Sequence, residues 1–199
     1  MKLILVRHGE TIWNKEKKIQ GITDIGLNER GIEQAEKLAY SLQKEKLDAI
    51  ITSPLRRSYD TAQAIGKYHD ISITVEEDLQ ELNAGELEGL TWTELARYPE
   101  FLAKWKLDKA SVPMPKGESH VDVQNRVWPV IQRISETFQS ALIVSHSFVI
   151  ISILCKIQNL DLSHSANLRI GASSKTCVNI ENGLGTVLYF NDTAHLCDN

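Results

Sequence analysis

Cysteine is scarce in this sequence, and its three cysteines lie far apart. Cys155, Cys177 and Cys197 form no C-x-x-C pair, so the sequence indicates neither a disulfide framework nor a zinc site. We expect Cys155 and Cys177 to pack in the core. Cys197 lies close to the end of the sequence, where we expect an exposed thiol.

Long apolar runs and an excess of positive charge are also missing. No stretch approaches the length that crosses a bilayer, and the apolar run at 3–6 is too short for the core of a signal peptide. The net charge of −4 argues against a general nucleic-acid or membrane-surface binder, which normally presents a basic face. We therefore expect a soluble, cytoplasmic protein without nucleic-acid or membrane partners, in which any anion site is local.

Length and composition favour one domain spanning residues 1–199. A chain of this size buries a substantial core, and 42% hydrophobic with 24% charged residues is close to the globular average. Residues 90–117 are rich in aromatic residues, lysine and proline without a clear period. We interpret this segment as a lid or insertion.

Short apolar segments alternate with helical patterns along the chain, which predicts a three-layer α/β/α sandwich with a mainly parallel central sheet. Asn182-Gly183 is a hairpin signal between the last two expected strands. Strands are expected at 3–6, 49–51, 72–75, 141–146, 177–183 and 186–192. Helices are expected from Asn28, over 54–68 behind Ser53 as N-cap, from Thr91 to before Pro99, from Ser119 with a kink at Pro129, and over 148–157.

Two of the expected strands end in histidine. "LILVRH" ends at His8 and "ALIVSH" at His146, and adjacent parallel strands would bring both imidazoles to one edge of the sheet. A third strand leads to Arg57 in the first turn of a helix, whose amino end favours anions. Arginine matches phosphate oxygens, and neutral histidine can act as a nucleophile. This cluster, with Arg7, suits a phosphoryl group.

The sequence resembles the histidine phosphatase superfamily in its phosphoglycerate-mutase-like branch. The matching segments follow the order of that family along nearly the whole chain. They are "RHGET.WN" at 7–14, "QG..D..L...G..QA" at 20–35, "SPLRRSYDTA" at 53–62, "LQELNAGELEG" at 79–89, "GES" at 117–119, "VSH" at 144–146 and "NDTAHL" at 191–196.

The resemblance implies a role for each matching residue. It makes His8 the nucleophile that forms a phosphohistidine, and Glu81 the acid that protonates the leaving oxygen and later acts as base towards water. Glu81 must then have a raised pKa, through burial or through Glu86 and Glu88. The phosphoryl oxygens are held by Arg7, Arg57 and His146, with substrate contacts from Asn14, Gln20 and Gly21; no metal or cofactor takes part. Ser147 is added as a further candidate for substrate contact.

One residue departs from the family pattern, because members usually have glycine where Ser147 follows the second histidine. Its hydroxyl could serve as an extra donor, whereas glycine would allow closer backbone approach. Several other residues are expected to have no part in the chemistry. Surface positions are expected for Arg56 and the histidines at 69, 120 and 164, and structural roles for Gly85, Glu88 and Gly89. Packing is expected for Trp92, Tyr98, Phe101, Trp105 and Met114. His195 is either structural or near the mouth of the site.

Three functions fit these residues. A cofactor-independent phosphatase would hydrolyse a small-molecule phosphomonoester: phosphoserine, α-ribazole phosphate or a broad range of substrates. A phosphoglycerate mutase would use the same core, but the chain lacks the longer insertions that we associate with mutases. A non-catalytic phospholigand-binding module is disfavoured by the intact residue set. A homodimer through an edge strand or an exposed helix is also compatible with the sequence.

Overall fold

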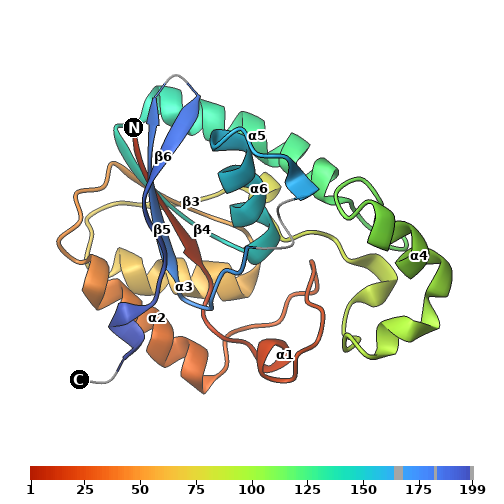
Figure 1. Ribbon diagram of the computed structural model, residues 1–199. Helices are drawn as coiled ribbons and strands as arrows, with labels where there is room; N and C mark the ends of the chain where they lie inside the picture. Colours follow the sequence, from red (N-terminus) through yellow and green to blue (C-terminus); the bar gives the residue numbers. More distant parts are fainter. Residues whose placement is uncertain (164–167, 182, 198–199) are drawn as a thin grey trace.

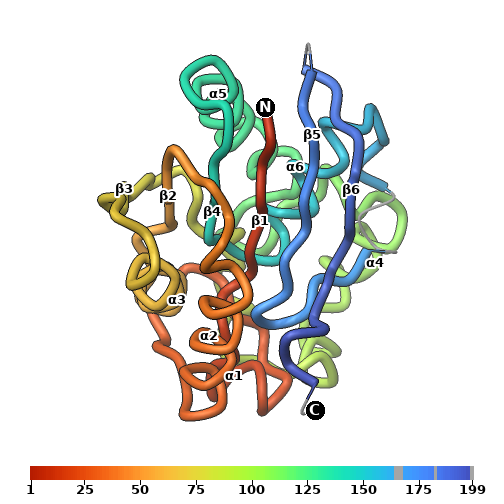
Figure 2. Tube along the Cα trace, turned by 90° about the vertical axis from the view of Figure 1, so that its left-hand side faces the viewer, coloured from red at the N-terminus to blue at the C-terminus, as the bar shows by residue number. Residues whose placement is uncertain are grey.

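The computed structural model describes residues 1–163, 168–181 and 183–197, and within them the centre is a six-stranded sheet. Figure 2 shows the strands side by side in the order β3-β2-β4-β1-β5-β6. β3, β2, β4 and β1 are parallel to one another, whereas β5 runs antiparallel to both β1 and β6. The bounds are β1 Lys2–Arg7, β2 Ala49–Thr52, β3 Ile73–Val75, β4 Ser140–Ser145, β5 Lys175–Glu181 and β6 Leu184–Asp192.

Helices cover both faces of this sheet, which confirms the predicted three layers (Figure 1). Ile4 and Val6 of β1 face one core, shared with α2 (Glu29–Leu42) and α3 (Arg56–Gly66). Alternate residues of a strand point to opposite faces, so Leu3 and Leu5 face the other core. That core is shared with α5 (His120–Thr137) and α6 (Ser147–Ile157).

The remaining elements are short and lie mainly in the connections. The segment 90–117 extends to one side of the sheet in Figure 1 and carries α4. These elements are α1 Ile12–Lys15, η1 Glu77–Leu79, η2 Gly85–Leu87, η3 Glu94–Arg97, α4 Pro99–Leu107 and η5 Ala194–Leu196, where η denotes a 3₁₀ helix. Within the described residues, the structure contains no helix long and apolar enough to span a membrane.

The prediction for Thr91 to Pro99 was wrong about which helix forms. Thr91 donates to Glu94 as expected, its backbone nitrogen lying 2.9 Å from Oε2, but only the short η3 follows. Pro99 begins α4 instead of marking the end of a helix. Proline is favoured at the first helical position, because the missing N–H has no partner there in any case.

Other predicted boundaries hold with small shifts. α3 begins at Arg56 behind Leu55, so Ser53 is not its N-cap. Ser119 caps α5 as predicted, and this helix continues through Pro129. Cys155 and Cys177 are buried and Cys197 is exposed, as predicted. Two predictions, for Asn182 in the hairpin and for His164, lie outside the described residues.

Close backbone packing fixes the loop that follows β1. Gly31 of α2 lies against this loop, and a Cβ on it would be 2.0 Å from the carbonyl oxygen of Glu10. We expect Gly31→Ala to lower the free energy of unfolding by about 1–3 kcal/mol, as overpacking does, and Tm by roughly 2–12 °C. Thermal unfolding checks this. Gly26→Ala is the matched control, because its Cβ would meet nothing nearer than 3.6 Å, and equal losses in both variants would contradict the packing argument.

Candidate active site

The carboxyl ends of β1 and β4 bring the two histidines together, as the sequence predicted. Arg7 lies opposite Ser145 in the parallel register, and the His8 N–H donates to the Ser145 carbonyl at 3.1 Å. The next residue of each strand is therefore a histidine at the same edge. The ring centroids of His8 and His146 are 5.2 Å apart.

His8 is held in one tautomer. Its Nδ1 lies 2.7 Å from the Gly9 carbonyl oxygen, which can only accept, so Nδ1 carries the proton and Nε2 presents a lone pair. The ring is 3% exposed. Burial first, and then the positive charges of Arg57 and Arg7, lower its pKa well below the usual value. A neutral imidazole with an available Nε2 is the form that can act as a nucleophile.

His146 is fully buried, and two serine hydroxyls surround one of its nitrogens. Its Nε2 lies 2.8 Å from Oγ of Ser53 and 3.3 Å from Oγ of Ser58. Its Nδ1 has no hydrogen-bond partner within the described chain. Burial, followed by the charge of Arg57, lowers its pKa well below the usual value, so the ring is neutral.

Two arginines supply positive charge; Arg57 is fully buried and Arg7 is half-buried. Arg57 donates from Nη2 to the Gly21 carbonyl at 2.7 Å and from Nη1 to the Thr23 carbonyl at 3.0 Å. Burial lowers its pKa to about 10, so it stays charged at neutral pH. Arg7 donates from Nη1 to the Ile170 carbonyl at 2.5 Å, and its buried Nε has no partner among the described residues.

Glu81 is the buried carboxyl group beside these cations. It is 5% exposed, and its Oε1 accepts from the Leu82 N–H at 2.9 Å. Burial raises its pKa, although this hydrogen bond and the arginines oppose the shift. Burial is thus the cause, rather than Glu86 or Glu88, which the sequence had offered as the alternative.

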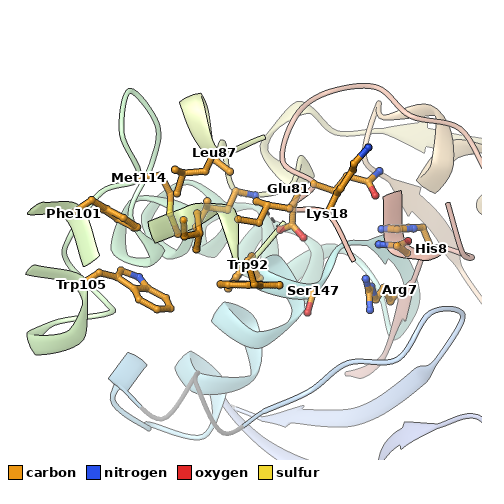
Figure 3. A pocket seen from close by; sticks show the side chains of 17 residues that line it. Arg7, His8, Lys18, Glu81, Leu87, Trp92, Phe101, Trp105, Met114 and Ser147 are labelled. Carbon is orange, nitrogen blue, oxygen red and sulfur yellow. Dashed lines mark hydrogen bonds between the residues drawn. The ribbon is translucent and has the colours of Figure 1, made fainter. Parts of the chain in front are cut away.

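A cavity of about 130 Å³ opens beside this cluster. Figure 3 shows Arg7 and His8 at one end, Phe101, Trp105 and Met114 at the other, and Glu81 between them. Its lining also includes Asn14, Gln20 and Ser147, three of the residues for which the sequence predicts substrate contacts. Positive charge and a neutral imidazole therefore lie at one end of an open cavity, with a buried carboxyl group beside them.

The family model for the histidine phosphatase superfamily, branch 1, matches residues 3–193. The chain belongs to this superfamily. It is accordingly a phosphatase, and so a hydrolase. Phosphoserine phosphatase 1 of Hydrogenobacter thermophilus is 33% identical, over 98% of this chain and 94% of the relative.

Solved structures agree with this assignment. A mutant phosphoserine phosphatase from Entamoeba histolytica, in complex with phosphoserine, is 30% identical with a TM-score of 0.85, covering 98% of this chain and 99% of the other. The α-ribazole phosphatase from Shigella flexneri is 26% identical with a TM-score of 0.88, covering 97% of both chains. The similarity to these solved structures therefore extends over nearly the whole of this histidine phosphatase.

Some predicted substrate-binding residues of this histidine phosphatase hold Arg57 in place. The Gly21 carbonyl accepts from Arg57, as described above. With its amide turned to satisfy both sides, Gln20 accepts from Nε of Arg57 at 3.2 Å and donates to Thr11 Oγ1 at 2.7 Å. Glu88 in turn accepts from backbone N–H groups of the loop that follows Gly21. Arg57 and His146 do not line the cavity and lie behind its wall. The charge of Arg57 acts on His8, and the ring of His146 lies beside the ring of His8.

The structure also shows a residue that the sequence analysis missed. Arg126 of α5 donates from Nη2 to the Glu81 carbonyl at 3.1 Å and forms an ion pair with Glu118 at 2.8 Å. Arg126 thereby fixes the backbone of Glu81. Glu118 belongs to the "GES" segment at 117–119 that matches the family, but nothing in the sequence pointed to a role for Arg126.

Two surface predictions for histidines were wrong. His120 is 4% exposed and its ring lies 4.5 Å from that of Phe148, and burial lowers its pKa to about 4. The helical spacing from His120 to the buried Val123 could have indicated this. His69 is half-buried, and so is His195, whereas Arg56 is exposed as predicted.

Within the described residues, no three His, Cys, Asp or Glu side chains are grouped to hold a metal ion.

Proposed function

We propose that this histidine phosphatase hydrolyses a small phosphomonoester through a phosphohistidine on Nε2 of His8. The observation that carries the proposal is the bond from Nδ1 to the Gly9 carbonyl, which directs the lone pair of a neutral ring away from the backbone. In the first step the Nε2–P bond forms, the ester P–O bond breaks, and Glu81 protonates the leaving oxygen. Water then gives a proton to Glu81 and attacks phosphorus, which releases phosphate and restores His8.

Donors without protein partners supply the binding of the phosphoryl oxygens. These are Nε of Arg7, which lines the cavity, and Nδ1 of His146, which in this proposal meets the phosphoryl group from behind the lining; the charge of Arg57 is added. Asn14 accepts from the Thr11 N–H through Oδ1, so its amide nitrogen is the group available to substrate. Phosphoryl transfer depends mainly on in-line positioning and on neutralising charge on three oxygens, and this set supplies both.

Ser53 is a positioning residue in this scheme. Oγ of Ser53 accepts from the Leu55 N–H at 3.2 Å and is placed to donate to Nε2 of His146, which leaves the ring proton on Nδ1. We expect Ser53→Ala to lower kcat about tenfold, the value of one hydrogen bond, and to shift the ¹⁵N resonances of His146 towards the other tautomer. Ser58→Ala should do less, because its contact is 3.3 Å long. Loss of activity with unchanged His146 resonances would contradict the positioning role.

Ser147 fits the site without glycine. It is the first residue of α6 and lines the cavity, and its backbone φ is not among the positive values of the described chain. Helical backbone suits any residue, so the departure from the family pattern needs no strained conformation. We propose that its hydroxyl contributes a further contact to substrate.

Phosphate release from a substrate panel tests the proposed function. The panel contains p-nitrophenyl phosphate, phosphoserine, α-ribazole phosphate and 3-phosphoglycerate, assayed with a metal chelator present. Release of inorganic phosphate, with a stable phosphohistidine trapped on His8 after rapid acid-free denaturation, supports the proposal. Interconversion of 2- and 3-phosphoglycerate without phosphate release would support the mutase alternative, and binding without either reaction would support a phospholigand-binding module.

A further inference from the structure

We propose that the preferred substrate is a phosphomonoester whose leaving group carries an aromatic ring or an apolar body of similar size, and no ammonium group. This inference rests on the proposed function and concerns the part of the cavity beyond Glu81. The relatives named as phosphoserine phosphatases would instead suggest a zwitterionic amino acid as leaving group.

The order of groups along the cavity places the leaving group against apolar walls. Glu81 lies between the end with Arg7 and His8 and the end with Phe101 and Trp105 (Figure 3). A phosphoryl group at His8 with its ester oxygen at Glu81 must therefore extend the rest of the molecule towards the aromatic end. The apolar part of the lining is Ile19, Leu82, Ala84, Leu87, Trp92, Leu95, Phe101, Trp105, Met114 and Phe148.

The size of the cavity suits one ring. Its volume is about 130 Å³, close to that of cavities of about 150 Å³ with aliphatic and aromatic walls that are known to bind benzene, and it adjoins a second cavity of about 660 Å³. The rings of Phe101 and Trp105 are stacked with centroids 6.1 Å apart and form the far wall. Nε1 of Trp105 is buried without a partner in the described chain, so an acceptor atom on the ligand would satisfy it.

The charges around the site do not match an ammonium group. Glu81 is the one carboxylate among the described residues that line this cavity, and it is committed to the ester oxygen. An adjoining cavity shares Arg7, Trp92, Trp105, Ser147 and Phe148, and its further charged lining is Lys109 and Arg169. An ammonium group would thus lie among cations without a carboxylate to receive it, and burying an unpaired charge is costly.

Four esters of primary alcohols separate shape from chemical reactivity. The compounds are 2-phenylethyl phosphate, benzyl phosphate, ethyl phosphate and O-phosphoserine, and inorganic phosphate is measured without metal. We expect kcat/KM for 2-phenylethyl phosphate to exceed that for ethyl phosphate and for O-phosphoserine by at least about tenfold, the discrimination typical of an added apolar group in an apolar pocket.

Variants of the aromatic wall test whether it causes the preference for 2-phenylethyl phosphate over ethyl phosphate. Phe101→Ala and Trp105→Ala should each reduce the ratio of kcat/KM for 2-phenylethyl over ethyl phosphate by about fivefold to tenfold. Tyr40→Ala is the matched control, because Tyr40 is an aromatic residue of α2 that is 64% exposed, and this ratio should not change in it. Using a ratio removes any general loss of folded enzyme.

The outcomes distinguish this inference from the proposed function. A preference for O-phosphoserine, or a ratio near one that the wall variants leave unchanged, would overturn the apolar leaving group while leaving the phosphatase mechanism intact. No phosphate release from any ester, including p-nitrophenyl phosphate, would instead overturn the proposed function.

Discussion

Replacing His8 with alanine removes phosphate release almost completely. We expect kcat to fall by at least about 10⁴-fold, as it does when the nucleophile of a covalent mechanism is removed. The hydrogen bond from Nδ1 of His8 to the Gly9 carbonyl leaves the lone pair of the ring on Nε2. His146 cannot replace His8, because its Nε2 faces Ser53 and Ser58. The variant should also give no phosphohistidine when the reaction with p-nitrophenyl phosphate is quenched and examined by mass spectrometry.

Binding measurements separate this effect from misfolding. Arg7, Arg57 and His146 remain in the His8→Ala variant, so inorganic phosphate should still bind, with an affinity within about tenfold of the parent enzyme. His69→Ala is the matched histidine control and should retain activity, since His69 follows α3 away from the cavity lining. Appearance of the phosphoryl group on another residue in the parent enzyme would show that the nucleophile is misassigned.

The strands β1 and β4 could be predicted because the residue pattern that identifies each of them lies within a few consecutive positions. Four buried residues of β1 and the buried run of β4 have no helical period, and each strand is followed by polar residues where the sheet ends. Parallel pairing then fixes where His8 and His146 meet. α4 was missed because its aromatic residues and lysines have no clear apolar stripe, and because Pro99 fits the start of a helix as well as the end of one.

The support around the catalytic groups could not be predicted in the same way. Ser53 and His146 are 93 positions apart, and their contact depends on how β2 and β4 pair. Arg126 reaches the Glu81 backbone from α5, again through tertiary packing. The aromatic residues at 92–105 were assigned to packing, and Tyr98 and Phe101 do pack against the core. Trp92, Phe101 and Trp105, however, line the cavity. The irregular spacing of these residues predicts neither core packing nor a place in the cavity lining.

Replacing Glu81 with glutamine should slow reactions in proportion to how much the leaving oxygen needs a proton. For ethyl phosphate we expect kcat/KM to fall about 10²- to 10⁴-fold, the range for general acid catalysis. For p-nitrophenyl phosphate the fall should be less than about tenfold, because nitrophenolate leaves without protonation. Glutamine keeps the shape and can still accept from the Leu82 N–H, so the comparison isolates the proton. Equal slowing of both esters would contradict the acid role.

The pH dependence gives a second test of the same residue. Burial raises the pKa of Glu81, and the first step needs its protonated form, so activity on ethyl phosphate should fall as pH rises through that pKa. The pKa of His8 is lowered, so its neutral form persists to low pH and limits only the acid side. The phosphate group of the substrate titrates at about pH 6 with both enzymes, so its contribution cancels when their pH profiles are compared. In Glu81→Gln the part of the fall at high pH that exceeds the titration of the substrate should disappear while the acid limb stays, since the amide does not titrate; an unchanged alkaline limb would assign the acid to a different group.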